Sequence, residues 1–139
     1  MSRLWISGEP VPQPRHRVTS IGGFARTYLP SKHPIRAWKQ EIALRGRGAF
    51  RCIDGPLEVS LLFYLPRPKT KWRKTKPNDV VPHCSKPDAD NLAKAVCDAL
   101  NGVAWHDDGQ VSRLLVAKMI CGDGQREPGV LIEIKEAGQ

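Results

Sequence analysis

The chain has 139 residues, of which 40% are hydrophobic, and this is enough for one domain with its own core. No apolar run approaches the roughly 18 residues of a membrane span, and the first residues lack the pattern of a signal peptide. The four cysteines form no CxxC pair, so the pattern indicates neither a zinc ribbon nor a redox motif. We therefore expect reduced thiols in a cytoplasmic protein without a membrane anchor.

The net charge of +8 is unevenly distributed along the chain. Residues 1–86 carry 17 Lys and Arg against 5 Asp and Glu, whereas residues 87–139 carry 5 against 9. The basic part favours a polyanionic partner, most often nucleic acid. A charge that serves only solubility is the alternative, and the charge alone leaves it open.

The first predicted element is a short strand at residues 3–7, followed by a proline-rich extended loop. The next pattern, Arg15-His16-Arg17 followed by Gly22-Gly23 and residues 24–29, fits a strand pair with a loop between, and the loop carries the cations. Arg15 and Arg17 are candidate DNA contacts. An ordinary solvated hairpin is the alternative.

A first helix is predicted at residues 31–45, where apolar residues recur at helical spacing and form one face. That face consists of Ile35, Trp38 and Ile42. Gly46 and Gly48 are expected to end the helix. The clearest strand follows at residues 57–65, where apolar and more polar residues alternate with period two.

Residues 66–86 are predicted to form a mobile basic loop, because prolines interrupt a run of cations with little to bury. Its candidate DNA-binding residues are Arg67, Lys69, Lys71, Trp72, Arg73, Lys74, Lys76 and Lys86. The cations can displace counterions from a phosphate backbone, and Trp72 can stack on an unpaired base. We interpret the loop as a DNA clamp, and the alternative is a solvated surface loop with an incidental tryptophan.

The second helix is predicted to begin at Asp90 or Asn91 and to end at Leu100. Strands at residues 111–120 and 130–135 follow, separated by a turn-rich loop. The predicted fold is therefore a single α+β domain over residues 1–139, with one mixed β-sheet backed by two α-helices.

Acidic residues gather around the second helix, since five of the fourteen in the chain fall between residues 86 and 111. Carboxylates held close together repel unless a positive group lies among them, and a divalent cation is the simplest such group. Asp88 and Asp90 precede the helix in what we expect to be extended chain, which would place both on one side. Lys94 lies one helical turn beyond Asp90.

Asp107 and Asp108 are adjacent, so in extended chain they point to opposite sides and only one can readily join the first pair. We favour Asp108, because it begins the approach to the next strand. Three carboxylates at one point would form a hard oxygen site for Mg²⁺ or Mn²⁺. Such a site can polarise a phosphoryl oxygen and activate water, while Lys94 can stabilise developing negative charge.

Structural roles would also explain these residues. Asp88 or Asp90 can serve only as a helix cap, and the Asp107-Asp108 pair can serve only in a turn. Asp98 can form a surface ion pair with Lys94. His83 and His106 are interpreted as loop residues, because no spacing indicates zinc.

Three blocks stand in order along the second half of the chain: KPDADNLAK at residues 86–94, DALNG at residues 98–102 and WHDDGQV at residues 105–111. Taken together they resemble the RusA family of Holliday junction resolvases, which are crossover junction endodeoxyribonucleases. Each block alone is weak, but their order and spacing are specific. A weaker similarity extends over most of the chain, whereas the basic loop is less alignable.

The resemblance implies a small homodimeric endonuclease, often encoded by phages or prophages, that uses Mg²⁺ to place paired nicks in four-way DNA junctions during recombination and repair. By motif position it assigns Asp88, Asp90 and Asp108 as metal ligands and Lys94 as the catalytic lysine. It also implies a secondary contribution from Asp107 to the metal site. Two symmetric cuts in a two-fold junction also suit two identical sites related by a two-fold axis.

Two other classes of function remain open. The protein can be a non-catalytic junction- or DNA-binding protein in which the acids hold a structural metal ion, although the intact set of three aspartates and a lysine argues against this. It can also be a small-molecule phosphohydrolase. The basic segment and the absence of a Gly-rich nucleotide-binding motif argue against that class.

Overall fold

The protein was analysed as a computed structural model, which describes residues 1–14, 17–21, 24–28 and 33–138. Two α-helices, seven β-strands and two short 3₁₀ turns were assigned within these ranges. In chain order they are β1 (Ser2–Ser7), β2 (Arg17–Ile21), β3 (Phe24–Tyr28), α1 (Ile35–Ala49), β4 (Leu57–Leu65), η1 (Lys69–Lys71), β5 (Val81–Pro82), α2 (Ala89–Leu100), η2 (Asp108–Gln110), β6 (Val111–Ile120) and β7 (Gly129–Glu136).

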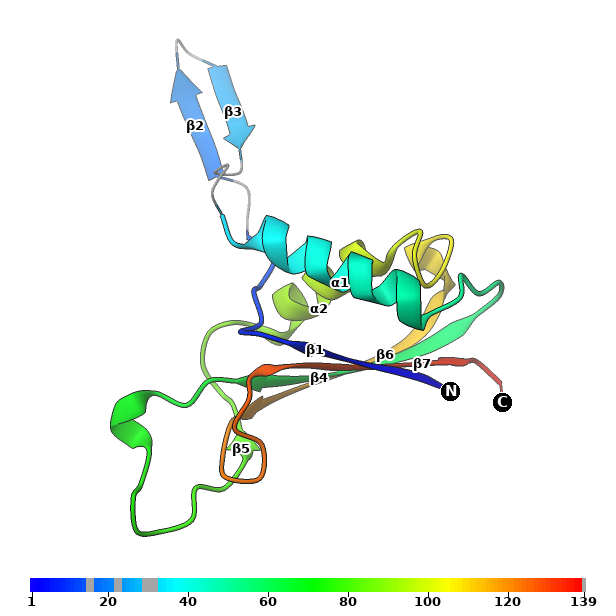
Figure 1. The fold of residues 1–139 in the computed structure, drawn as a ribbon. Coiled ribbons are helices and arrows are strands. Elements are labelled where there is room, and N and C mark those ends of the chain that lie inside the picture. Colours follow the sequence, from blue (N-terminus) through cyan, green and yellow to red (C-terminus); the bar gives the residue numbers. More distant parts are fainter. Residues whose placement is uncertain (15–16, 22–23, 29–32, 139) are drawn as a thin grey trace.

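Five strands form one sheet in the order β1-β7-β4-β6-β5. The β4–β6 pair is parallel and the other pairs are antiparallel, so the sheet is mixed. Both helices cover the same face of this sheet (Figure 1). The predicted single α+β fold, with one mixed sheet backed by two helices, is confirmed.

The core lies between the sheet and the helices, and the alternating pattern of β4 shows why. Its odd-numbered residues are buried and its even-numbered residues are partly exposed on the opposite face. The buried residues are Leu57, Val59, Leu61, Phe63 and Leu65. From above them α1 contributes Ile35, Trp38 and Ile42, as the helical spacing predicted.

The predicted end of the first helix is wrong, because α1 continues through Gly46 and Gly48 to Ala49. The reason is packing against the end of α2. A Cβ atom placed on Gly46 would lie 2.9 Å from Leu100 Cδ2 and 3.2 Å from Val103 Cγ1. Glycine at position 46 thus permits the two helices to approach closely rather than ending the first one.

The β2–β3 hairpin and the basic loop, residues 66–86, both project from the sheet-and-helix body (Figure 1). The hairpin extends beyond the N-terminal end of α1, and the basic loop leaves the sheet at the same end of the molecule on the other side. Arg15 and residues 22–23 of the predicted loop lie outside the described residues. Arg17 begins β2.

The basic loop has local structure that its sequence did not indicate. It contains the turn η1 and the two-residue strand β5, and its one buried polar residue is Asn78. The Asn78 side chain accepts a hydrogen bond from the Arg73 N–H at 2.9 Å and donates one to the Arg73 carbonyl at 3.0 Å. The Asn78 N–H donates to the Asp123 carboxylate at 3.0 Å, so the backbone of the loop is tied to the β6–β7 connection.

The four cysteines are free thiols in this structure. None of the helices in the described ranges combines the length and the hydropathy needed to cross a membrane.

Candidate active site

The start of α2 separates the first two candidate aspartates. Asp88 is the N-cap residue, with extended backbone dihedrals, whereas Asp90 already lies in the first turn of the helix. Successive helical residues are rotated by about 100°, so the two carboxylates leave the chain in different directions. The expectation that both lie in extended chain on one side is therefore wrong. Both remain close to the positive end of the helix dipole.

An exposed cleft of about 590 Å³ lies between α2 and the edge of the sheet at β6. We call it the acidic cleft. It is lined by Ala89, Asp90, Ala93, Lys94, Cys97, Asp98, Asp108, Val111, Leu114 and Val116. Asp90 and Lys94 are one turn apart on the same face of α2, as the spacing predicted, and neither has an ion pair within the described residues.

Asp108 enters the acidic cleft from the turn before β6 and is partly buried. Its Oδ1 accepts a hydrogen bond from the indole Nε1 of Trp105 at 2.8 Å. Trp105 is completely buried, so its ring position is fixed by the core. The core therefore orients the Asp108 carboxylate directly, and the sequence analysis did not find this contact although Trp105 belongs to the third block.

Asp107 does not line the acidic cleft. Its carboxylate caps the turn η2 by accepting the Gly109 N–H at 2.8 Å. The turn alternative thus describes Asp107, whereas Asp108 is the member of the pair that reaches the cleft. A role of Asp107 as a secondary contributor remains a prediction.

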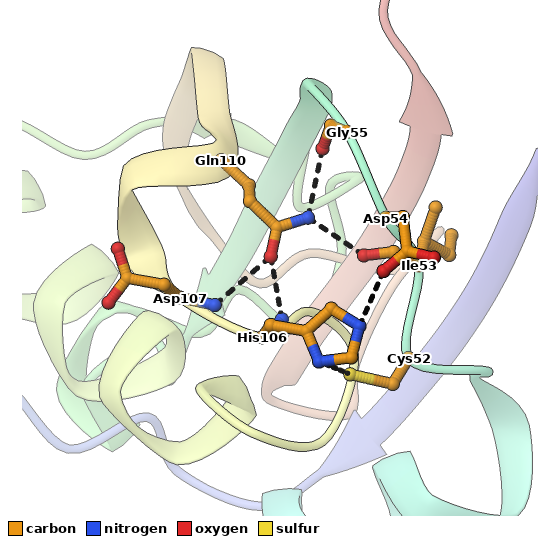
Figure 2. A network of polar contacts seen from close by, with 7 residues as sticks. All are labelled: Cys52, Ile53, Asp54, Gly55, His106, Asp107 and Gln110. Atoms are coloured by element: carbon orange, nitrogen blue, oxygen red, sulfur yellow. Dashed lines mark hydrogen bonds and ion pairs between the residues drawn. The ribbon is translucent and has the colours of Figure 1, made fainter.

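Gln110 fixes the loop that carries both aspartates (Figure 2). Its Oε1 accepts from the backbone N–H groups of His106 and Asp107 at 2.7 and 3.0 Å. Its Nε2 donates to the carbonyls of Ile53 and Gly55 at 2.7 and 2.9 Å. All the hydrogen-bonding groups of this amide are thus used to join the Asp107-Asp108 loop to the segment before β4.

His106 extends this network at the surface (Figure 2). Its Nε2 lies 2.7 Å from the Asp54 carboxylate, and its Nδ1 lies 3.4 Å from Cys52 Sγ. Like Gln110, His106 therefore joins the loop that carries Asp107 and Asp108 to the segment before β4. His106 lies between α2 and η2, in agreement with its interpretation as a loop residue.

Cys97 lines the acidic cleft beside two of its carboxylates. Burial, and then the charges of Asp108 and Asp98, raise the pKa of the Cys97 thiol to about 12. This thiol therefore stays protonated at neutral pH. Asp98 is paired with Lys39 of α1 at 3.7 Å rather than with Lys94, so the proposed Lys94–Asp98 surface pair is wrong.

Asp88 faces a neighbouring pocket of about 490 Å³ that it shares with Lys86, Gln13 and Asn91. Its carboxylate forms an exposed ion pair with Lys86 at 3.4 Å. The Gln13 N–H donates to the Asn91 carbonyl at 2.9 Å, while the buried Gln13 Oε1 has no hydrogen-bond partner within the described residues. Gln13 is therefore an oxygen donor beside Asp88 that sequence reasoning missed.

Lys118 of β6 holds the chain that leads into α2. Its ammonium group donates to the carbonyls of Ser85 and Pro87 at 2.8 Å each. The residue before the cap of α2 is therefore tied to the sheet. No signal in the sequence could have indicated this role, because it depends on the approach of a strand and a loop 31 to 33 residues apart.

The oxygen donors of the site fit a divalent cation of the Mg²⁺ type. No three His, Cys, Asp or Glu side chains in the described ranges lie close enough to share one ion. Mg²⁺, however, usually takes only one or two protein carboxylates and completes its shell with water and substrate phosphates. Asp90 and Asp108 meet that requirement in one cleft, and a third ligand from Asp88 remains a prediction.

The basic loop presents its cations to solvent. Arg67 is partly buried, and its guanidinium donates to the carbonyls of Asp79 and Cys121, the latter at 2.8 Å. Five cations beyond it are exposed and have no ion pair within the described ranges. These are Lys69, Lys71, Arg73, Lys74 and Lys76.

Trp72 is held inside the basic loop. Its indole N–H donates to the Arg67 carbonyl at 3.1 Å. The guanidinium groups of Arg67 and Arg126 lie 5.6 and 4.6 Å from the centre of its ring, which is cation–π distance. Trp72 thus already makes cation–π contacts within the protein, and base stacking by Trp72 remains a prediction.

The fold and the site define a small α+β protein with a carboxylate- and lysine-lined cleft beside an exposed cationic loop. The sequence profile of the family described as Endodeoxyribonuclease RusA matches residues 7–135, which is nearly the whole chain. The chain belongs to the RusA endodeoxyribonuclease family, and the general activity of that family is the resolution of Holliday junctions.

One similar protein is the uncharacterized protein YqaN of Bacillus subtilis (strain 168). The two chains are 33% identical over 141 residues, which is 96% of this chain and 95% of YqaN. The two chains therefore align over nearly their whole lengths.

Proposed function

We propose that this chain is a Mg²⁺-dependent endodeoxyribonuclease that resolves four-way DNA junctions by paired symmetric nicks. It acts as a homodimer in the bacterial cytoplasm, in recombination and repair, and is encoded by a phage or prophage. The observation that carries the proposal is the acidic cleft of a RusA family chain, where Asp90, Asp108 and Lys94 line one exposed surface.

The reaction is hydrolysis of a phosphodiester. Water adds its oxygen to phosphorus, the bond to the leaving deoxyribose oxygen breaks, and a proton passes to that oxygen. Asp90 and Asp108, with Asp88 joining them, would hold Mg²⁺ or Mn²⁺, which when bound supplies Lewis-acid polarisation of the phosphate and a more acidic water.

The residues of the chain have separate tasks in this reaction. The Lys94 ammonium offsets the negative charge that develops on the non-bridging phosphate oxygens. Trp105 and Gln110 keep Asp108 in place through the contacts described above. The cations of the basic loop, together with Arg15, Arg17 and Lys86, bind the phosphate backbone and hold the junction.

The test uses a synthetic four-way junction, labelled in turn on each strand, with and without Mg²⁺. The wild type should give paired nicks at symmetric positions only with the metal. Asp90→Asn removes the charge of one ligand but keeps its shape, so cutting should fall by about 10²-fold or more while junction binding is retained. Glu41→Gln on α1 removes one negative charge far from the cleft and should cut normally.

Two results would contradict the proposal. Tight junction binding without nicks in any divalent metal would make this a non-catalytic junction-binding protein. Cutting by Asp90→Asn at the wild-type rate would remove Asp90 from the site. Competition by long duplex DNA separates both outcomes from a small-molecule phosphohydrolase, whose activity would not respond to it.

A further inference from the structure

Three side chains that the proposed reaction does not use are in contact at the surface (Figure 2). Cys52 Sγ lies 3.4 Å from His106 Nδ1, and His106 Nε2 lies 2.7 Å from the Asp54 carboxylate. We call these three residues the Cys52 triad. Because the thiol and the carboxylate contact different nitrogens of one imidazole ring, the three groups are connected in series.

The Asp54 carboxylate determines which nitrogen of His106 carries the proton. An ionised carboxylate only accepts hydrogen bonds, so the Nε2 atom beside it is the donor. The neutral ring then has its lone pair on Nδ1, which faces the sulfur of Cys52. The thiol therefore has a base within hydrogen-bond reach, and a third group orients that base. This is the arrangement that activates a nucleophile.

The backbone that carries the Cys52 triad is held in place. The Gln110 side chain accepts a hydrogen bond from the His106 N–H at 2.7 Å. It also donates to the carbonyls of Ile53 and Gly55, the two residues that flank Asp54. The base and its orienting carboxylate are thus positioned by backbone contacts before any reagent arrives, which favours reaction over a chance encounter of mobile side chains.

The Cys52 triad is open to solvent. Cys52 is exposed, and the side chains of His106 and Asp54 are 60% and 93% exposed. An ion pair in this setting adds little to stability, and Gln110 already joins the same two segments. Stability therefore does not account for the arrangement, whereas a small reagent dissolved in water can reach the sulfur directly.

The other three cysteines lack this environment. Cys84 is also exposed, but its sulfur has no hydrogen-bond partner within the described ranges. Cys97 has its pKa raised to about 12, and Cys121 is completely buried. Because the deprotonated thiol is the nucleophile, the last two should be inert at neutral pH. Cys84 is the reference for an exposed thiol without a neighbouring base.

We infer that Cys52 is a modification site at which hydroperoxides oxidise the thiol, with His106 as the base and Asp54 as its positioning residue. In the reaction with hydrogen peroxide, the S–H proton passes to His106 Nδ1 and the sulfur attacks one peroxide oxygen. The S–O bond forms while the O–O bond breaks, and the leaving hydroxide takes the proton from His106. The thiol is oxidised to a sulfenic acid and the peroxide is reduced to water.

This reaction goes beyond the proposed nuclease function and does not depend on it. A sulfenic acid condenses with a further thiol, with formation of an S–S bond and loss of water. Since Cys52 is exposed, a low-molecular-weight thiol is the simplest partner for that step. The modification would then be reversible by reduction.

The first test compares the four thiols within one molecule. Native, reduced protein is treated at fixed neutral pH with iodoacetamide or, separately, with hydrogen peroxide and dimedone, which traps sulfenic acids. Peptide mass spectrometry follows each cysteine. Cys52 should react about tenfold faster than Cys84 with either reagent, below the usual effect of a positioned base because water competes at this open site. Cys97 and Cys121 should stay unmodified.

The second test removes the base and its orienting group in turn. His106→Asn should lower the rate at Cys52 to that at Cys84. Asp54→Asn should give an intermediate rate, because the amide no longer fixes the ring tautomer. The ¹⁵N NMR shifts of the His106 ring report this directly, with the Nε2–H form in the wild type and a mixture in Asp54→Asn. Asp79→Asn, at another exposed aspartate, is the matched control and should change neither readout.

Three results would overturn the inference. Cys52 and Cys84 could react at equal rates, or Cys52 could be alkylated rapidly without forming a dimedone adduct. Cys52 could also stay fast in a His106→Asn variant whose circular dichroism spectrum is unchanged, which would assign its reactivity to exposure or to the neighbouring Arg51. No DNA or divalent metal is present in these experiments. Failure here therefore leaves the proposed nuclease function untouched, and failure of that function leaves the Cys52 triad untouched.

Discussion

In the acidic cleft the charged side chains stand on packed elements, whereas in the basic loop they stand on a backbone that is anchored at Arg67 and Asn78 and otherwise exposed. Asp90 and Lys94 are placed by the buried face of α2, and Asp108 is placed by a buried tryptophan. The difference matches two different tasks. Chemistry depends on the position of a charge, while attachment to a polyanion depends mainly on how many charges are available.

The largest predicted effect is a loss of DNA binding when cations of the basic loop are removed. Replacing Lys71, Arg73, Lys74 and Lys76 by alanine removes four exposed cations. Each phosphate contact contributes about 0.9 to the slope of log affinity against log salt, which is about eightfold in affinity for a tenfold change in salt. Junction affinity at low salt should therefore fall by about 10²-fold or more, and the salt slope should flatten, as measured with Ca²⁺ in place of Mg²⁺.

The matched control removes four exposed arginines of α1 and the segment after it, Arg36, Arg45, Arg47 and Arg51. This variant has the same net charge as the loop variant. If both variants lose the same affinity and slope, total charge rather than the basic loop binds DNA, and the loop returns to the interpretation as solvated surface. The rate of cutting at saturating protein should be retained in the loop variant.

The second effect concerns how the acidic cleft is held. Gln110→Ala removes four hydrogen bonds and leaves the Ile53 carbonyl without its partner, so unfolding free energy should fall by about 1–3 kcal/mol. Because the loop that carries Asp108 is then released, cutting at limiting Mg²⁺ should fall by about 10- to 100-fold. Thermal unfolding and a Mg²⁺ titration of cutting measure the two parts.

Gln40→Ala provides the control for Gln110, because Gln40 is an exposed glutamine on α1. It should change neither stability nor the Mg²⁺ requirement. A Gln110→Ala variant that loses stability but keeps the wild-type Mg²⁺ dependence would show that the network supports the fold without positioning the site.

A similar contrast explains which features of the fold could be predicted from the sequence. The period-two pattern of residues 57–65 gave β4 with its correct bounds, because alternation depends only on local geometry. The end of α1 could not be read in the same way. Whether Gly46 stops a helix or admits a neighbouring one depends on Leu100, which is 54 residues away and meets it only in the folded chain.

In the candidate site, too, local spacing predicted some features, whereas others depend on contacts between distant segments. Spacing alone placed Asp90 and Lys94 on one face and favoured Asp108 over Asp107, because these relations are set within a few residues. Spacing did not reveal that Asp88 faces another pocket, since that depends on where the helix begins. Nor could it reveal Lys118 or Gln110, whose partners come from distant segments.

The smallest predicted effect isolates one hydrogen bond to the acidic cleft. Trp105→Phe keeps the buried aromatic ring but removes the indole N–H that binds Asp108 Oδ1. A contact that orients a metal ligand typically changes metal affinity by 10- to 100-fold, and a single neutral donor should lie near the lower end, at about tenfold. Calorimetric titration of the DNA-free protein with Mg²⁺ measures the metal affinity independently of DNA cutting.

Trp38→Phe is a closely matched control, because Trp38 is also buried but its Nε1 has no hydrogen-bond partner within the described residues. Both variants lose the same atoms from the core, so equal Mg²⁺ affinities in the two would mean that Trp105 contributes packing alone. A weaker affinity only in Trp105→Phe would show that the buried core sets the position of the Asp108 carboxylate, which is the property that the exposed cations of the basic loop lack.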